Sequence, residues 1–289
     1  MNRNTTLRLL VFFLGIPLLA VGAFIGRDAG LPVFGALVVT ASAMAAREAA
    51  VFFPASVRAY PGTVVLIPLI GAVVPFVGYL EAVSGAPATL VVPVVTIGSA
   101  IIMALQLLRQ RAADISLIVP VVSAHLFLLV YPGLFAWHAA RLVTLPASSE
   151  LIVLFFLSVY LNDSLAWLFG RLFARPRPSA VGPLVPISPN KSLVGFVAGF
   201  LTSVAVIVLA GVLFPEVLPG TVGMHLVFGV VIGAVSIIGD LVESGFKRSA
   251  AVKDSGNVIP GRGGLLDSID SAMYAAPFFF WACVILLHA

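Results

Sequence analysis

Long apolar runs alternate with short polar breaks along the chain. Nine runs come near or above the roughly 20 residues that span the hydrocarbon core of a bilayer. They cover about residues 6–25, 31–53, 62–81, 86–108, 115–135, 150–173, 192–214, 222–243 and 272–288. The breaks carry turn-forming residues, as in Tyr60-Pro61-Gly62. This pattern predicts an all-α, polytopic integral membrane helical bundle of about nine transmembrane helices.

The composition supports a membrane protein and excludes a soluble core. Of the 289 residues, 61% are hydrophobic and only 10% are charged. The single cysteine, Cys283, has no partner, so neither a disulfide framework nor a cysteine-based metal cluster is available. The first apolar run has the basic flank of a signal peptide, but no convincing cleavage pattern follows it, so we expect a retained helix.

Basic residues test the span count independently, because they collect on the cytoplasmic side of a membrane. If the N-terminus is cytoplasmic, only Arg27 and Arg141 of the 16 Lys and Arg residues fall on the opposite face. We therefore expect a multi-pass protein of the cell membrane with a cytoplasmic N-terminus. The net charge of +4 then indicates anionic lipid headgroups as partners, and no nucleic acid.

The residues that could carry chemistry gather in the second half of the chain, and nothing resembles a soluble domain. We therefore divide the sequence into two parts. Residues 1–135 are expected to form an N-terminal membrane bundle of about five spans. Residues 136–289 are expected to form a catalytic membrane region of about four spans with polar cytoplasmic loops.

Asp163 is an ionisable residue inside an apolar run, LIVLFFLSVYLNDSLAWLFG. An ionised carboxylate in a membrane span is costly unless it faces a polar cavity, a cation or a partner. The alternative is a structural hydrogen bond between helices, made together with Asn162 and Ser164. We favour a functional role. In the same run Trp167 is expected to face lipid or to pack.

The most polar continuous passage, residues 244–271, reads SGFKRSAAVKDSGNVIPGRGGLLDSIDS. Glycines let backbone N–H groups approach phosphate oxygens closely, and basic side chains neutralise phosphate charge. The passage supplies glycines at 261, 263 and 264 and the bases Lys247, Arg248, Lys253 and Arg262. It is therefore suited to bind phosphate groups.

Paired carboxylates flank or occupy this passage. Asp240 and Glu243 are three residues apart, as are Asp267 and Asp270, so each pair shares one helical face. Taken alone, each pair has an ordinary explanation. Glu243 can pair with Lys247, and acidic residues are favoured at a helix N-terminus. Together with the glycines and bases, the carboxylates predict a phosphate site with a divalent cation, because Mg²⁺ prefers carboxylate oxygens and substrate phosphates.

The passage S-G-F-K-R-x4-K-D-S-G-x2-I-P-G-R-G-G-L-L-D-S-I-D resembles the family pattern of phosphatidate cytidylyltransferases, also called CDP-diacylglycerol synthases. A second block agrees in order. It consists of Asn162-Asp163-Ser164, Gly170-Arg171 and the segment ISPNKS at residues 187–192. The first half of the chain matches mainly in hydropathy.

This resemblance implies a Mg²⁺-dependent nucleotidyltransferase that moves the cytidylyl group of CTP to phosphatidate. The products are CDP-diacylglycerol, for phospholipid biosynthesis, and pyrophosphate. The implied Mg²⁺ carboxylates are Asp163, Asp240, Asp267 and Asp270, with a second cation as an option. Catalysis is assigned to Asp240, Lys247, Arg248, Lys253, Asp267 and Asp270. Substrate phosphates are assigned to Arg171, Ser188, Lys191, Ser192, Arg262, Gly263 and Gly264. The active site is expected on the cytoplasmic side, and a homodimer is compatible with the sequence.

The chain departs from the family pattern at two positions of the polar passage. Arg262 stands where the family usually has histidine, which keeps a donor for phosphate. Ser268 stands where the family usually has arginine, which removes a fixed positive charge and bears on activity and substrate. Outside the two blocks, Glu48 at the cytoplasmic end of the run 31–53 is expected to anchor that end, with a supporting role at the site as the alternative.

Two other classes of protein remain open from the sequence. A CTP-dependent polyprenol or phytol kinase would release CDP and a lipid phosphate instead of pyrophosphate and a CDP-lipid. A secondary transporter would use membrane carboxylates such as Asp163 for ion coupling, and inverted repeats would support it. No convincing internal similarity is present.

Overall fold

A computed structural model describes residues 21–59, 63–86, 88–106, 112–173, 184–259 and 261–288. Most of the predicted first span, residues 6–25, lies outside the described residues. Helices joined by loops make up the described chain. Its only β-type pairing is an isolated bridge between Ile259 and Gly263, and no strand occurs in these ranges.

Ten α-helices make up the described bundle. They are α2 (Pro32–Ala49), α3 (Ala55–Arg58), α4 (Thr63–Ser84), α5 (Val91–Leu105), α6 (Ile118–Leu128), α7 (Phe135–Arg141), α8 (Ser148–Phe173), α9 (Leu193–Leu213), α10 (Val222–Ser249) and α11 (Leu266–His288). A π-helical turn, η5 (Leu129–Leu134), joins α6 to α7, so these two helices form one continuous run. The predicted division after residue 135 falls within this run and stays a prediction.

Seven described helical segments are long and apolar enough to cross a membrane, which confirms the all-α polytopic bundle. They are Pro32–Phe52, Leu66–Ser84, Ile115–Thr144, Ser148–Phe173, Leu193–Leu213, Val222–Ser249 and Leu266–His288. α5 matches the predicted run 86–108 but is a shorter apolar helix of 15 residues. The number of spans, predicted as nine, stays a prediction.

Three of the predicted apolar runs were shorter than the helices that contain them. The run predicted at 115–135 continues to Thr144, the run at 222–243 continues as α10 to Ser249, and the run at 272–288 begins at Leu266. Hydropathy ends a run at the first polar residues, whereas a helix tolerates acidic residues in its first turn and basic residues in its last. Both ends of the polar passage are therefore helical, and the loop of residues 250–265 lies between them.

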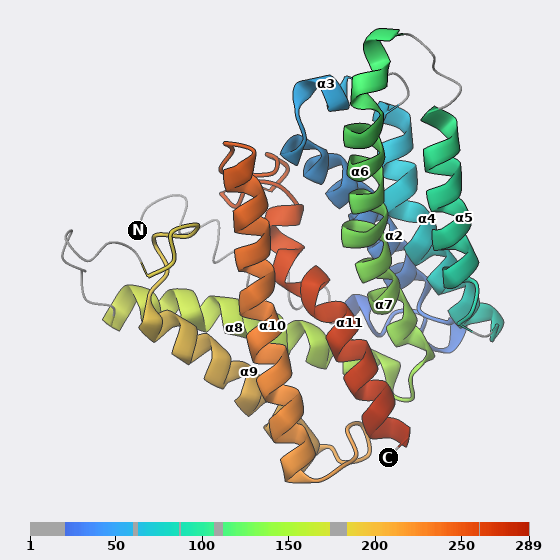
Figure 1. The fold of residues 1–289 in the computed structure, drawn as a ribbon. Coiled ribbons are helices and arrows are strands. Elements are labelled where there is room, and N and C mark those ends of the chain that lie inside the picture. Colours follow the sequence, from blue (N-terminus) through green and yellow to red (C-terminus); the bar gives the residue numbers. More distant parts are fainter. Residues whose placement is uncertain are drawn as a thin grey trace.

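The helices form two groups that meet at α11 (Figure 1). α2, α4, α5 and α6 gather on one side, and α8, α9 and α10 pack together on the other. α11 lies between them and contacts α2, α7, α8 and α10. The N-terminal group thus reaches the polar passage through α11 and the loop before it.

Two contacts agree with the predicted alternation of helix ends. Arg27 pairs with Glu150 at 2.8 Å, which joins the segment before α2 to the start of α8. Glu48, near the other end of α2, contacts the start of α11. Each contact joins segments that the nine-span reading places on the same face. Which face is cytoplasmic stays a prediction.

The packing of α8, α9 and α10 depends on small residues. A side chain at Gly229 of α10 would lie 2.7 Å from the backbone of Val204 in α9, so only glycine allows this approach. Asn162 of α8 donates a 2.9 Å hydrogen bond to Ser203 of α9, which donates to the carbonyl of Ser158. Small interface residues and hydrogen bonds between helices are typical of membrane bundles. These three helices form a tightly packed support for the candidate site.

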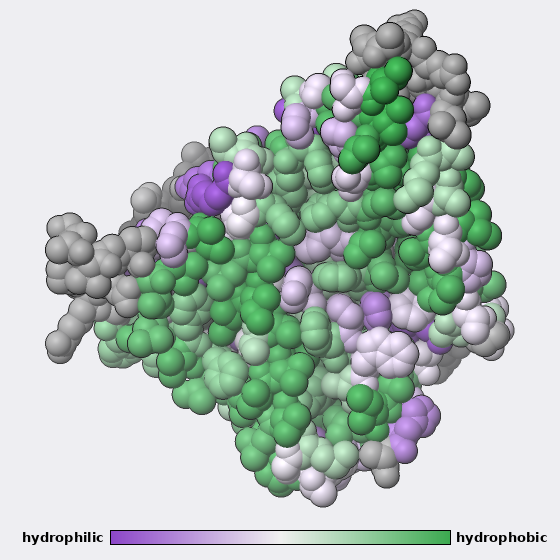
Figure 2. All heavy atoms as spheres, in the orientation of Figure 1, coloured by the Kyte–Doolittle hydropathy of each residue, from purple (hydrophilic) through white to green (hydrophobic). Residues whose placement is uncertain are grey.

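The visible outer surface is mostly hydrophobic, as expected for helices that face lipid (Figure 2). A cluster of hydrophilic residues lies beside the C-terminal end of α10 (Figure 2). This end leads into the loop of residues 250–265, so the polar passage is concentrated at one end of the bundle.

Candidate active site

A polar cavity of about 510 Å³ opens between α8, α9 and α10. Its wall includes Arg171 of α8, Lys191 and Ser192 in the segment before α9, and Asp240 of α10. Ser192 also begins α9, because its hydroxyl accepts a 3.1 Å hydrogen bond from the N–H of Gly195. The cavity therefore combines two cations, a carboxylate and a hydroxyl group at a helix N-terminus.

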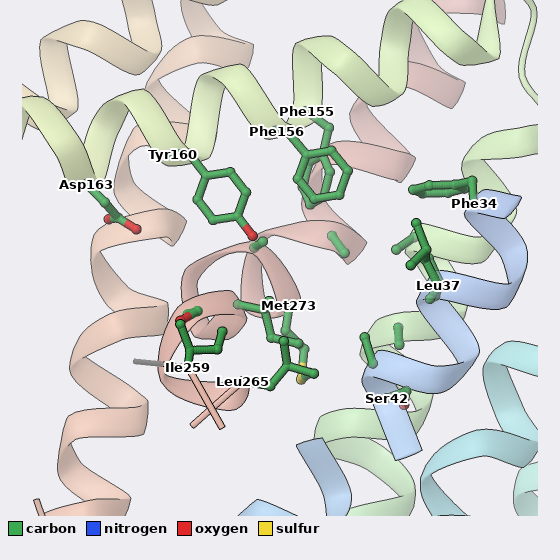
Figure 3. A pocket seen from close by; sticks show the side chains of 18 of the residues that line it. Phe34, Leu37, Ser42, Phe155, Phe156, Tyr160, Asp163, Ile259, Leu265 and Met273 are labelled. Carbon is green, nitrogen blue, oxygen red and sulfur yellow. The ribbon is translucent and has the colours of Figure 1, made fainter. Parts of the chain in front are cut away.

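A second cavity, of about 290 Å³, is mostly apolar and lies between α2, α7, α8 and α11 (Figure 3). Phe34, Phe155 and Met273 supply apolar wall. Tyr160 and Asp163, near the middle of α8, supply polar side chains to one end of this cavity (Figure 3). An apolar space with a polar end is suited to a molecule that is itself amphipathic.

Asp163 lines both cavities. Its carboxylate accepts a long 3.5 Å hydrogen bond from the hydroxyl of Ser271 in α11. The neighbouring Asn162 is only 1% exposed and makes the structural hydrogen bonds between α8 and α9. Consecutive helix positions point about 100° apart, so Asn162 faces α9 while Asp163 faces the two cavities. The functional role of Asp163 stays a prediction.

The polar cavity holds one ion pair and two cation–π pairs, the second of them between Lys191 and Phe196. Lys191 forms an ion pair with Asp240, which connects the segment before α9 to α10. The guanidinium of Arg171 lies 5.5 Å from the ring centroid of Trp167. Trp167, which was expected to face lipid or to pack, in fact lines the polar cavity. Its place one turn after Asp163 brings it to the same opening of the helix bundle.

The four carboxylates predicted to bind Mg²⁺ do not all come together. Asp163 and Asp240 line the same polar cavity, and Asp270 is buried in α11 next to Ser271, whose hydroxyl donates to Asp163. In the described ranges, no group of three or more His, Cys, Asp or Glu side chains is close enough to hold an ion by itself. The donor chemistry still fits Mg²⁺, because this ion uses one or two carboxylates and completes its shell with water and substrate phosphates.

Asp267, the fourth carboxylate, is taken up by contacts within the protein. Its Oδ1 accepts a 2.7 Å hydrogen bond from Lys247. Its Oδ2 accepts hydrogen bonds from the N–H of Gly264 at 2.7 Å and from the N–H and hydroxyl of Ser255 at 2.9 and 3.0 Å. Asp267 therefore organises the loop before α11. Its assignment as a metal ligand and catalytic residue stays a prediction.

Lys247 bridges two carboxylates. It pairs with Asp267 and also with Glu243, four residues earlier in α10, as the sequence left open. Glu243 is completely buried, and Lys247 is 13% exposed in its side chain. A cation held between two carboxylates is less free to bind a substrate phosphate. Lys247 thus joins α10 to α11 in the described structure.

Gly263 and Gly264 have a steric role that the sequence did not specify. Gly263 has a φ of +106°, and a side chain there would lie 2.6 Å from Asp267 Oδ2. A side chain at Gly264 would lie 2.4 Å from Glu48 Oε2. The N–H of Gly263 donates to the carbonyl of Ile259, and that of Gly264 donates to Asp267. Phosphate binding by these two amides stays a prediction.

Glu48 of α2 holds the same loop from the other half of the bundle. It accepts hydrogen bonds from the N–H of Leu265 at 3.0 Å and of Leu266 at 2.7 Å. It also accepts one from the hydroxyl of Ser255 at 3.3 Å. The sequence left Glu48 as an anchor of its helix end or as a supporting residue. These contacts show that Glu48 supports the loop of residues 250–265, called the site loop below.

Other predicted phosphate ligands lie outside both cavities. Arg248 is exposed, and its Nε donates a 3.4 Å hydrogen bond to the carbonyl of Ile187. Lys253 is exposed, and Ser188 lies in the loop before α9 without lining either cavity. The structure thus places Arg171, Lys191 and Ser192 at the polar cavity and Arg262 at the apolar one.

The fold and the two cavities that share Asp163 define a polytopic helical membrane protein that can bring a polar and an amphipathic ligand to one carboxylate. Comparison with known families then gives a specific assignment. The model of the cytidylyltransferase family matches residues 6–286, nearly the whole chain. This chain belongs to the cytidylyltransferase family.

Individual relatives match a shorter part of the chain. A phosphatidate cytidylyltransferase of Staphylococcus epidermidis is 41% identical over 132 residues, which are 44% of this chain and 46% of the relative. The Staphylococcus aureus protein of the same name is 40% identical over 124 residues, 42% of this chain and 44% of the relative. "Uncharacterized protein YnbB" of Escherichia coli is 38% identical over 150 residues, 50% and 47%. The chain thus spans about half the length of the curated relatives it matches.

Proposed function

We propose that this protein transfers the cytidylyl group of CTP to phosphatidate, giving CDP-diacylglycerol and pyrophosphate. The observation that carries the proposal is the position of Asp163, which lines both the polar and the apolar cavity. A water-soluble nucleotide and a membrane lipid must react at a residue that both can reach, and Asp163 is such a residue. Family membership and the names of the staphylococcal relatives support this reaction.

CTP is assigned to the polar cavity, where Arg171 and Lys191 can neutralise its phosphates. Ser192 adds a hydroxyl at the start of α9, where the positive end of the helix dipole favours an anion. Lys191 must then exchange its pairing with Asp240 for a phosphate, or hold both. Either case brings the nucleotide next to the carboxylates.

The reaction requires a phosphate oxygen of phosphatidate to form a bond with the α-phosphorus of CTP. The bond from that phosphorus to the oxygen bridging to the β-phosphate breaks, and pyrophosphate leaves with the electron pair. No general base is needed, because a phosphate monoester is already largely ionised near neutral pH. The protein contributes mainly by positioning two anionic reactants and neutralising their charge.

Mg²⁺ is the cofactor we expect, and Asp163, Asp240 and Asp270 are the residues that would hold it. When bound, such an ion stabilises the charge that develops on phosphate oxygens and on the leaving group. The cytoplasmic location of the site, a second cation and a homodimer remain parts of the proposal. Cytoplasmic CTP and the predicted excess of basic residues on that face support the location.

The test is turnover by purified protein in detergent with phosphatidate and CTP labelled at either the α- or the γ-phosphate. Transfer of the α-label to lipid, stopped by EDTA, is the expected result. Transfer of the γ-label to lipid would instead assign a lipid kinase. Absence of any labelled lipid from folded protein would overturn the proposal. Asp163→Asn, checked for its thermal unfolding midpoint, is the matched inactive control.

A further inference from the structure

The two cavities divide the predicted phosphate-binding cations into two sets. Arg171 and Lys191 line the polar cavity, whereas Arg262 lines the apolar one. Among the described residues around the apolar cavity, Arg262 is the only Lys or Arg. A cation beside an apolar space is costly unless an anion or hydrogen-bond partner compensates it. The apolar cavity therefore has a place for an anionic group.

Arg262 differs from the other partly buried cations of the site in its pairing. Lys191 pairs with Asp240, and Lys247 pairs with two carboxylates. In the part of the chain that the structure describes, no carboxylate lies within ion-pair distance of Arg262. Arg262 lines the same cavity as Tyr160 and Asp163, so its guanidinium shares that space with the two polar groups from α8. A planar guanidinium matches the geometry of a phosphate group.

Tyr160 supplies a second polar group to the same cavity. Its hydroxyl points into the cavity, towards the side formed by α11 (Figure 3). Tyr160 is partly buried and makes no hydrogen bond to any described residue, so its hydroxyl is available to a ligand. It precedes Asp163 by three residues on the same face of α8, which is about 4.5 Å along the helix axis. The Tyr160 hydroxyl can therefore donate a hydrogen bond to an oxygen of a ligand bound in this cavity.

We propose that Arg262 and Tyr160 form the headgroup site of the lipid substrate. Arg262 binds the phosphate of phosphatidate, and Tyr160 donates a hydrogen bond to an ester carbonyl of its glycerol backbone. Arg171 and Lys191 bind the triphosphate of CTP instead. This inference rests on the proposed function and adds to it a division of the cations between the two substrates. Tyr160 becomes a specificity-determining residue for diacyl lipids.

Ser268 is consistent with this arrangement. It is 9% exposed, lines the same cavity as Arg262, and its hydroxyl lies 3.4 Å from the carbonyl of Gly264. A small side chain at this position leaves Arg262 as the cation of the cavity. Arg262 and Ser268, the two departures from the family pattern within the polar passage, thus line the same cavity. The prediction that Ser268 bears on the substrate acquires a structural basis.

A pair of matched variants separates the two cation sets. Arg262→Gln is expected to raise the KM for phosphatidate by about 10- to 100-fold, the cost of a charged hydrogen bond, with the KM for CTP unchanged. Arg171→Gln is expected to show the opposite pattern. KM is measured in mixed micelles with phosphatidate expressed as a surface mole fraction. A rise in the KM for CTP alone in Arg262→Gln would overturn the proposal.

Tyr160 is tested by pairing a protein change with a lipid change. Tyr160→Phe is expected to lower kcat/KM about two- to tenfold with diacyl phosphatidate, the worth of a neutral hydrogen bond. With dialkyl phosphatidate of equal chain length, which lacks ester carbonyls, the same substitution should have no effect. An equal loss on both lipids would show that the hydroxyl does not bind a carbonyl.

Direct binding keeps this inference separate from the proposed function. Detergent-purified full-length protein is titrated with dioleoyl phosphatidate or with dioleoylglycerol and examined by native mass spectrometry. The wild type should retain phosphatidate in preference to dioleoylglycerol, and Arg262→Gln should lose that preference. Preferential binding that depends on Arg262, without formation of CDP-lipid, would defeat only the proposed function. Turnover with unchanged phosphatidate binding in Arg262→Gln would defeat only this inference.

Discussion

Glu48 accepts a 2.7 Å hydrogen bond from the backbone N–H of Leu266, although the two residues are 218 positions apart. This contact joins α2, in the N-terminal half of the chain, to the first residue of α11. Because the first N–H groups of a helix have no partner within the helix, an acceptor there stabilises both the helix end and the preceding loop. The N-terminal half is thus coupled directly to the candidate site.

Glu48→Ala is therefore expected to lower both stability and activity. It leaves the N–H groups of Leu265 and Leu266 unpaired, at a cost of about 1–3 kcal/mol each. The thermal unfolding midpoint in detergent should fall, and the CTP turnover should fall with it because the site loop loosens. Glu48→Gln, which keeps one acceptor oxygen, should have an intermediate effect. The exposed neighbour Arg47 provides the control, and an equal loss in Arg47→Ala would contradict the assignment.

Gly263→Ala is expected to disrupt the same loop by steric conflict. A methyl group would lie 2.6 Å from Asp267 Oδ2, and φ is +106°, where residues with a side chain are strained. We expect a loss of at least about 1 kcal/mol in stability and a clear loss of turnover. Gly245→Ala in α10 is the matched control, because no atom lies within 4 Å of the added methyl group. Turnover and unfolding midpoint at wild-type values in Gly263→Ala would refute this role.

The sequence predicted the helices well and their polar ends poorly. Apolar runs located α2, α8 and α9 within a few residues, because lipid and the bundle core impose the same hydropathy. α11 begins earlier than predicted because Asp267 is compatible with the first turn of a helix, where backbone N–H groups need acceptors. Hydropathy carries no signal for that preference.

The candidate site was predictable in composition but not in its pairing. The three-residue spacing correctly placed Asp240 and Glu243 near one another on α10. It could not show that Asp240 would reach Lys191 and the polar cavity, whereas Glu243 would be buried against Lys247. The contact of Glu48 has no local pattern, since it depends on how α2 packs. Tyr160 was missed because the sequence does not distinguish an aromatic residue that faces lipid from one that lines a cavity.

Adjacent substitutions in α8 should separate chemistry from stability. Asp163→Asn is expected to lower kcat by at least about 100-fold, the effect of removing one preorganised electrostatic group, with little change in the unfolding midpoint. Asn162→Ala removes the 2.9 Å hydrogen bond to Ser203 and should cost about 1–3 kcal/mol in stability. Its folded fraction should retain more activity than Asp163→Asn. The reverse ranking of the two kcat values would reassign the functional role to Asn162.

Lys247 should prove more important for stability than for phosphate binding. Lys247→Ala leaves Glu243 and Asp267 without their cation, and breaking a buried ion pair from one side costs about 3–5 kcal/mol. The unfolding midpoint in detergent should fall by several degrees. Lys253→Ala, at an exposed position of the same passage, should change it little. Combining Lys247→Met with Glu243→Gln should recover part of the lost stability, because the buried charge is removed together with its partner. If Lys247→Ala instead kept its midpoint and raised only the KM for CTP, the lysine would be a substrate ligand and the bridge between α10 and α11 would be incidental.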